Sequence, residues 1–185
     1  MSSTHVILDT CVLFPGSLRD VLLRAAEEQL YRLYLTDQIL DELRKNLVGK
    51  KQITEERGLY IVNRMKERFH STFVTDHTFL IPTMPINEKD RHVLAAAIIS
   101  DSKVIVTQNL KDFPQSLLEP FGIESLSADD FLVRCLSQNE AAMIKIVRSY
   151  ANGLKNPPLT IQQALEKLRR LAPNFVQLIQ QEYGV

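Results

Sequence analysis

Four acidic residues stand where predicted strands end or in the helices next to them, and they are the strongest candidates for chemistry in this sequence. Asp9 directly follows the aliphatic run 6–8, which predicts a buried strand. A buried carboxylate costs several kcal/mol unless something pairs with it, so Asp9 needs a partner. The full set is Asp9, Glu42, Asp90 and Asp112.

The predicted secondary structure brings these acids to one place. Short apolar runs predict strands at 5–8, 31–35, 103–106 and 123–126, and helical patterns fill most of the intervals. This alternation favours a parallel sheet with right-handed crossovers. Ligand sites in such a sheet form outside the carboxyl ends of the strands, and all four acids are expected at that rim.

The second acid has to be chosen from Asp37, Asp41 and Glu42. At about 100° per residue, the apolar stripe of this helix centres between Leu40 and Leu43. Asp41 then lies nearly opposite the stripe, whereas Glu42 lies at its border. Helical phase therefore favours Glu42 as the acid that faces the rim.

Several carboxylates at one rim repel one another unless a cation supplies positive charge. No convincing His or Cys partner joins the set, which favours Mg²⁺ or Mn²⁺ over zinc. Such an ion lowers the pKa of a bound water and stabilises the transition state of phosphodiester hydrolysis. The implied chemistry is metal-dependent hydrolysis.

The segments that carry these acids resemble the PIN-domain ribonucleases, and within them the toxins of the VapC kind. The matching segments follow the family's order between residues 5 and 130 and are LDTCVLFPG, ILDELRKNL, NEKDRHVLAAAI and TQNLKDF. The resemblance implies that the four acids hold Mg²⁺ or Mn²⁺ and that a metal-activated water cuts single-stranded or loop RNA. It also implies that Thr107 and Asn109 orient the last loop.

One position departs from the family pattern. Cys11 stands two residues after the first acid, where the family more often has Asn or Ser. A thiol donates hydrogen bonds less well than an amide, so we expect weaker support for Asp9 and a lower metal affinity. The helical tail resembles the extra carboxyl-terminal region of some longer members.

Each acid also has an ordinary structural interpretation. Asp9 could be a turn residue at a strand end, and Asp112 could cap a turn. Asp90 could complete a capping arrangement with Asn87. Glu42 could be a solvated helix residue paired with a neighbour. The four acids together, in the family's order, favour a shared site.

Other polar residues near the acids have less specific signals. His92 is expected to be a packed, hydrogen-bonded histidine and not a catalytic base. Arg19, Arg91 and Lys111 lie close to the acids in sequence and are the candidate contacts to substrate phosphates. Most other basic residues are expected to be surface charges.

The composition is that of a soluble globular protein, with 45% hydrophobic and 24% charged residues among 185. Lys plus Arg and Asp plus Glu both total 22, so no net positive field would collect nucleic acid and any RNA contact must be local. The apolar runs are too short for a membrane span, and the two cysteines indicate neither a disulfide framework nor a thiolate zinc site. We expect a cytoplasmic protein without membrane association.

We predict an α/β fold: a PIN-like three-layer α/β/α sandwich with a central parallel sheet over residues 3–130, then an all-helical extension over 131–185. The predicted function is a metal-dependent endoribonuclease, the toxin of a type II toxin–antitoxin pair, with RNA as substrate. A small antitoxin is the expected partner, and a homodimer is plausible. Two alternatives stay open. One is a catalytically weak RNA-binding or partner-binding protein, and the other is a metal-dependent phosphatase, although Cys11 stands where dehalogenase-type phosphatases have a second Asp.

Overall fold

A parallel sheet of four strands forms the centre of the computed structural model, which describes residues 4–153 and 159–183. The strand order is β2-β1-β3-β4. Val6 of β1 is aligned with Leu33 of β2 on one side and with Val104 of β3 on the other. The bounds are β1 His5–Leu8, β2 Arg32–Tyr34, β3 Val104–Val106 and β4 Glu124–Leu126.

The central strands are apolar because both faces of the sheet are covered. Residues 6–8 of β1 and 104–106 of β3 are buried throughout. A strand that is buried on both faces has a continuous apolar run instead of an alternating pattern. All four predicted strands are confirmed, each within one or two residues of its predicted bounds.

Helices make up most of the remaining chain, and several begin at polar caps. The Thr36 hydroxyl accepts a hydrogen bond from the Ile39 N–H at 3.1 Å and so begins α3. Pro173 is the first residue of α10, where its missing N–H costs nothing. The α-helices are α1 Thr10–Leu13, α2 Gly16–Glu27, α3 Asp37–Lys51, α4 Glu55–Arg68, α5 Arg91–Ile99, α6 Gln115–Leu118, α7 Ala128–Gln138, α8 Glu140–Gly153, α9 Ile161–Arg169 and α10 Pro173–Tyr183. The short 3₁₀ turns are η1 His70–Thr72, η2 Thr78–Thr83, η3 Glu88–Asp90, η4 Leu110–Asp112 and η5 Glu119–Phe121.

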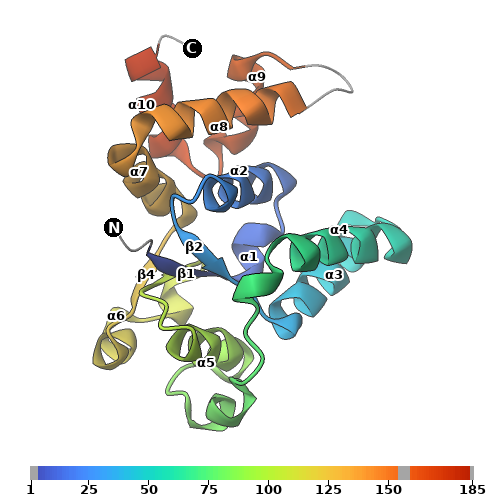
Figure 1. The fold of residues 1–185 in the computed structure, drawn as a ribbon, viewed down its shortest axis with the longest axis vertical. Helices are drawn as coiled ribbons and strands as arrows, with labels where there is room; N and C mark the ends of the chain where they lie inside the picture. Colours follow the sequence, from blue (N-terminus) through green and yellow to red (C-terminus); the bar gives the residue numbers. More distant parts are fainter. Residues whose placement is uncertain (1–3, 154–158, 184–185) are drawn as a thin grey trace.

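Helices cover both faces of the sheet. Figure 1 shows α5 on one side of the strands, α1 and α2 on the other, and the α3–α4 pair beside them. The predicted three-layer α/β/α arrangement is therefore confirmed. The sequence did not predict α1, which follows β1 after a single residue, or the short 3₁₀ turns.

The carboxyl-terminal region is helical, as predicted. Helices α7 to α10 pack on one another, and α8 and α9 also contact α2 of the sandwich. Figure 1 shows α8, α9 and α10 above α2 and α7 to its left, all on the far side of the sheet from α5. The predicted boundary at 130/131 falls inside α7, so the division into 3–130 and 131–185 stays a prediction. Residue 3 and the predicted break at 156–158 lie outside the described residues.

The chain reverses its direction of travel across the sheet between β1 and β3. From β1 it moves outward to β2 and then returns to β3 on the other side of β1. A crevice forms at the carboxyl ends of two such strands because their following loops diverge. Within the described part of the chain, no helix is long and apolar enough to cross a membrane.

Candidate active site

Asp9 leaves β1 at this crevice. Its N–H donates to the Val106 carbonyl of the neighbouring β3 at 3.0 Å, which extends the sheet by one residue. Its side chain makes no capping bond to α1, and one oxygen, Oδ2, instead accepts from the Thr107 hydroxyl at 2.8 Å. Asp9 is only 7% exposed. The buried carboxylate therefore has the partner that its burial requires.

The Cys11 thiol is a second donor to Asp9. Its Sγ lies 2.9 Å from Asp9 Oδ2 and accepts from the Gln108 N–H at 3.1 Å. Burial raises the pKa of Cys11 to about 12, and the Asp9 charge adds to the effect. The group is thus a protonated thiol at neutral pH. Cys11 keeps the donor role expected of the family's Asn or Ser, and the predicted loss of metal affinity stays a prediction.

The loop after β3 is organised around Thr107. The buried Thr107 hydroxyl donates to Asp9 and accepts from the Asn109 N–H at 3.0 Å. The Asn109 carbonyl then accepts from the Asp112 N–H at 2.8 Å, which forms the η4 turn. Through these contacts, the turn at residues 107–109 and the η4 turn together connect Asp9 to Asp112. The contribution of Asn109 comes from its main chain.

Asp90 and Asp112 lie together at the same crevice. Asp90 is 8% exposed, and its Oδ2 has no hydrogen-bond partner among the described residues. Burial is the main cause that raises the pKa of Asp90, and the charges of Asp112 and Asp9 raise it further, while Lys89 opposes them. Asp112 and Asp9 are therefore both close enough to Asp90 for their charges to act on it. The side chain of Asp90 makes no capping bond to α5, and Asn87 caps the η3 turn with its own side chain, which accepts from the Lys89 N–H.

Glu42 joins the cluster through the neighbours of the other acids. Its Oε2 accepts from the Thr10 hydroxyl at 3.1 Å, and its Oε1 lies 3.0 Å from Nε2 of His92. Partial burial raises the pKa of Glu42. The hydrogen bond and charge of His92, together with the hydrogen bond from Thr10, outweigh this effect and hold the pKa of Glu42 below its usual value. Asp41, by contrast, pairs with Lys45 at 2.6 Å near the surface. The helical phase argument thus separated the two acids correctly.

Some residues at the site had no distinct sequence signal. Thr10 is hidden in the LDTCVL run, and Lys89 is one cation among many. Lys89 Nζ lies 3.0 Å from Asp112 Oδ2 and 3.7 Å from Asp90 Oδ2. His92 is only 2% exposed, as expected of a packed histidine; its Nε2 lies 3.0 Å from Glu42 Oε1, and its buried Nδ1 has no hydrogen-bond partner among the described residues.

The three predicted phosphate contacts differ in how free their charged groups are. Arg19 Nη1 donates to the Leu13 carbonyl at 2.7 Å, and burial lowers the pKa of Arg19. Arg91 Nε donates to the Ile86 carbonyl at 3.1 Å. Lys111 lies exposed on the η4 turn beside Asp112. Of the three, Lys111 is exposed, whereas Arg19 and Arg91 are half-buried.

The donor set fits a hard divalent ion, but it is not a preformed metal site. Among the described residues, no three His, Cys, Asp or Glu side chains are gathered tightly enough to hold an ion together. Lys89 instead bridges two of the acids. Nevertheless all candidate ligands are carboxylates, and the buried Oδ2 of Asp90 accepts no hydrogen bond among the described residues and has the Lys89 ammonium only at 3.7 Å, so a closer positive partner would stabilise it. A divalent ion would supply it if the side chains adjust.

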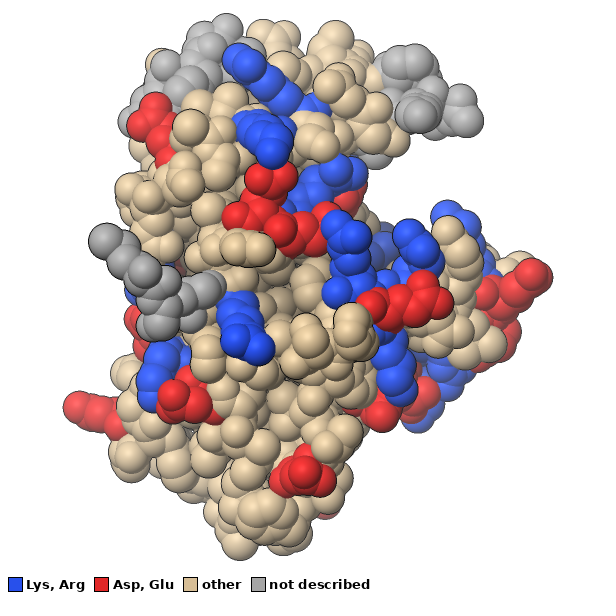
Figure 2. Space-filling model, viewed as in Figure 1, with Lys and Arg blue, Asp and Glu red and all other residues tan. Residues whose placement is uncertain are grey.

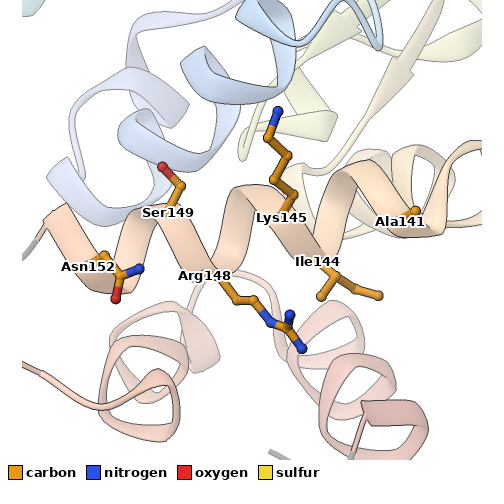
Figure 3. Close-up of a pocket in the computed structure, with 6 residues that line it drawn as sticks. All are labelled: Ala141, Ile144, Lys145, Arg148, Ser149 and Asn152. Carbon is orange, nitrogen blue, oxygen red and sulfur yellow. The ribbon is translucent and has the colours of Figure 1, made fainter.

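A hollow of about 600 Å³ lies elsewhere, along α8. In Figure 3, Lys145 and Ser149 point toward α2, whereas Arg148 and Ile144 point to the other side of the helix. Lys145 binds Glu28 at 2.9 Å, and Ser149 accepts from Arg24 at 2.8 Å. These polar groups hold α8 on α2, so the hollow carries no independent sign of chemistry.

Comparisons with known proteins agree with this geometry. The family model described as PIN domain matches residues 4–111, and the model described as VapC50 C-terminal domain matches residues 128–181. The chain is 38% identical over 105 residues to the Mycobacterium tuberculosis protein named "Putative ribonuclease VapC50", across 57% of this chain and 62% of that protein. The match thus spans about three fifths of the relative's length. No solved structure matches the chain. The chain belongs to the PIN domain family, with a carboxyl-terminal region of the VapC50 type.

Proposed function

We propose that this protein is a metal-dependent endoribonuclease, acting in the cytoplasm as the toxin of a toxin–antitoxin pair. The observation that carries the proposal is the group of acids at the carboxyl ends of β1 and β3. There the charges of Asp112 and Asp9 raise the pKa of the buried Asp90, and one Asp90 oxygen lacks a hydrogen-bond donor among the described residues. The family membership and the name of the VapC50 relative favour RNA as the substrate.

The residues divide into ligands and supports. Asp9, Glu42, Asp90 and Asp112 are the proposed ligands of Mg²⁺ or Mn²⁺, which when bound lowers the pKa of a water and neutralises charge on the phosphodiester. Thr107 and Cys11 fix the orientation of Asp9. Supports of this kind limit the freedom of a ligand and so favour one coordination geometry.

Glu42 is supported in the same way. Thr10 and His92 each engage one of its two oxygens, so its carboxylate is held before any ion binds. Each oxygen has a second lone pair for the ion or for a metal-bound water. We thus propose Glu42 as a ligand whose position is fixed before the ion binds. Asp90 is proposed as the ligand whose charge the ion stabilises most.

The proposed substrate contacts are local. Figure 2 shows Lys and Arg interspersed with Asp and Glu on the face it presents, which agrees with the zero net charge of the chain. Long-range collection of RNA is therefore weak. Lys111 at the rim is the proposed main contact to a phosphate, with Arg91 and Arg19 as secondary contacts.

A small antitoxin is the proposed partner. A hollow of about 520 Å³ lies between the end of α2, β2 and the end of α4, and a second of about 340 Å³ adjoins it. The apolar side chains of Leu23, Met65 and Phe69 line the second hollow, and the ion pair of Glu27 and Arg68 also lies along it. Co-purification with the product of a neighbouring gene tests the partner, and light scattering of the isolated protein tests the proposed homodimer.

Substitution of the first acid tests the enzyme. Asp9→Asn should lower the rate of RNA cleavage in Mn²⁺ or Mg²⁺ about a hundredfold or more, because it weakens binding of the ion that stabilises the transition state. It should also abolish Mn²⁺ binding measured by calorimetry. Asp101→Asn is the matched control, since Asp101 is exposed, has φ of 51°, which Asn tolerates, and pairs with Lys103.

Three outcomes separate the alternatives. Cleavage that persists unchanged in EDTA, or in Asp9→Asn, would contradict a metal-dependent mechanism. Mn²⁺ binding without cleavage of any RNA would favour the binding-protein interpretation. Hydrolysis of phosphate monoesters in place of RNA would favour the phosphatase.

A further inference from the structure

Lys89 places a positive charge between two of the acids. Its Nζ lies 3.0 Å from Asp112 Oδ2 and 3.7 Å from Asp90 Oδ2. The Lys89 side chain is 59% exposed, whereas the Asp112 and Asp90 side chains are 16% and 12% exposed. The exposed Lys89 side chain thus places its ammonium group beside two carboxylates that are mostly buried.

The other two acids do not depend on this cation. Asp9 has donors in Thr107 and Cys11, and Glu42 has Thr10 and His92. Asp112 Oδ2 accepts a hydrogen bond from Lys89, and Asp90 Oδ2 has no hydrogen-bond donor among the residues described. Lys89 is therefore the counter-charge for the pair of acids that the fold leaves least satisfied.

An ordinary surface ion pair is the alternative explanation for this contact. Lys103 and Asp101 form such a pair at 2.6 Å, with the two side chains 54% and 76% exposed. Lys89 differs because it contacts two acids, both mostly buried, at the carboxyl-end crevice of the sheet. A divalent ion that binds Asp90 and Asp112 would need the space and the oxygen lone pairs that the ammonium now uses.

We propose that Lys89 competes with the divalent ion for Asp90 and Asp112, and that its displaced ammonium binds a phosphate of the RNA at the same rim. The inference rests on the proposed function. Lys has a flexible four-carbon stem and a compact charge, so the group can leave the acids without a change in the backbone. Once an ion neutralises the acids, a substrate phosphate is the nearest strong anion left to it.

Metal affinity tests the competition directly. The dissociation constant for Mn²⁺ is measured by calorimetry on the full chain, without RNA, for the wild type, Lys89→Met and Lys89→Arg. Lys89→Met keeps the apolar stem and should bind Mn²⁺ about fivefold more tightly, the size expected for loss of an exposed ion pair. Lys89→Arg keeps the charge and should bind Mn²⁺ like the wild type.

Lys103→Met is the matched control, since it also removes one ion-paired lysine. Its Mn²⁺ affinity should equal that of the wild type. The gain in Lys89→Met should shrink as salt rises, because exposed charges are screened. Equal or weaker Mn²⁺ binding by Lys89→Met would overturn the inference while leaving the nuclease proposal intact. Failure of the wild type itself to bind Mn²⁺ would overturn both.

RNA affinity tests the second half. A hydrolysis-resistant phosphorothioate oligouridylate is titrated in Mn²⁺ and followed by fluorescence anisotropy. Lys89→Met should bind it more weakly, and the slope of log affinity against log salt should fall by about 0.7, the value for one lost phosphate contact on a single strand. An unchanged slope would refute the phosphate contact. Thus the same substitution is expected to tighten metal binding and weaken RNA binding.

Discussion

Two aspartates in different regions of the molecule are equally buried but differently satisfied. Asp90 lies at the start of α5, beside the sheet, and Asp129 lies in α7, the first of the carboxyl-terminal helices, and each is 8% exposed. Asp129 accepts hydrogen bonds from the N–H and the side-chain amide of Asn174 and from the Phe175 N–H, at 3.1, 2.9 and 2.9 Å. Asp90 has one oxygen with no such donor among the residues described, and its closest cation is an exposed lysine.

This difference distinguishes a structural carboxylate from a proposed metal ligand. Asp129 lies in the first turn of α7 and caps the first turn of α10, so its carboxylate joins the two helices. A buried carboxylate without donors lowers stability, and a fold retains it when something outside the chain uses it. Burial alone would have ranked the two acids together, whereas their partners distinguish them.

The largest effect on stability is expected in the extension. Asp129→Ala removes the acceptor of three hydrogen bonds and leaves the α10 N–H groups unsatisfied, so the free energy of unfolding should fall by about 3 kcal/mol. Urea unfolding followed by circular dichroism measures it. Mn²⁺ affinity at a temperature where the variant is folded should stay at the wild-type value. A loss below about 1 kcal/mol would mean that α10 is held by its apolar face alone.

The sequence predicted the elements but not the contacts that give Asp129 its role. Local patterns indicated the helices of the extension and the break at Pro173, because caps, apolar periodicity and proline act over a few residues. Asp129 binds residues more than forty positions away. No short-range signal distinguishes such an acid from a solvated one in the first turn of a helix.

The same limit applies at the candidate site. Strand ends, the sheet rule and helical phase were enough to bring Asp9, Asp90 and Asp112 together and to prefer Glu42 over Asp41. The contacts of Thr10 with Glu42 and of Lys89 with Asp112 were not predicted, because they depend on which side chains tertiary packing brings together. The sequence pattern thus predicted where the backbone places the acids, whereas tertiary packing decides which side chains pair.

A smaller effect of opposite sign is expected for Asp90. Asp90→Asn keeps the size of the side chain and removes a charge that the nearby Asp112 and Asp9 charges repel. In EDTA the variant should therefore be more stable than the wild type by up to about 1 kcal/mol, measured by urea unfolding. Asp129→Asn is the counterpart and should lower stability under the same conditions. If Asp90→Asn also lowers it, Asp90 belongs with the structural carboxylates and the contrast fails.

The smallest effect is expected where the two regions meet at the surface. Arg134 of α7 donates from Nη2 to Glu124 Oε2 of β4 at 3.0 Å and forms a second bond through Nη1. The hydrogen bond from Arg134 is the main cause that lowers the pKa of Glu124 below its usual value. Because the folded-state pKa is depressed, the pair adds stability above the pKa of the unfolded chain and loses it as pH falls through the folded-state value.

Glu124→Gln measures that contribution. Both side chains are more than a third exposed, so solvent screens the pair and the substitution should cost less than about 1 kcal/mol at neutral pH. The cost should vanish in acid, where the wild-type carboxylate is protonated, and urea unfolding at neutral and acid pH compares the two. A cost equal to that of Asp129→Ala would show that the extension is held to the sandwich by this surface pair as strongly as α10 is held to α7. The buried carboxylate would then have no special weight in that region.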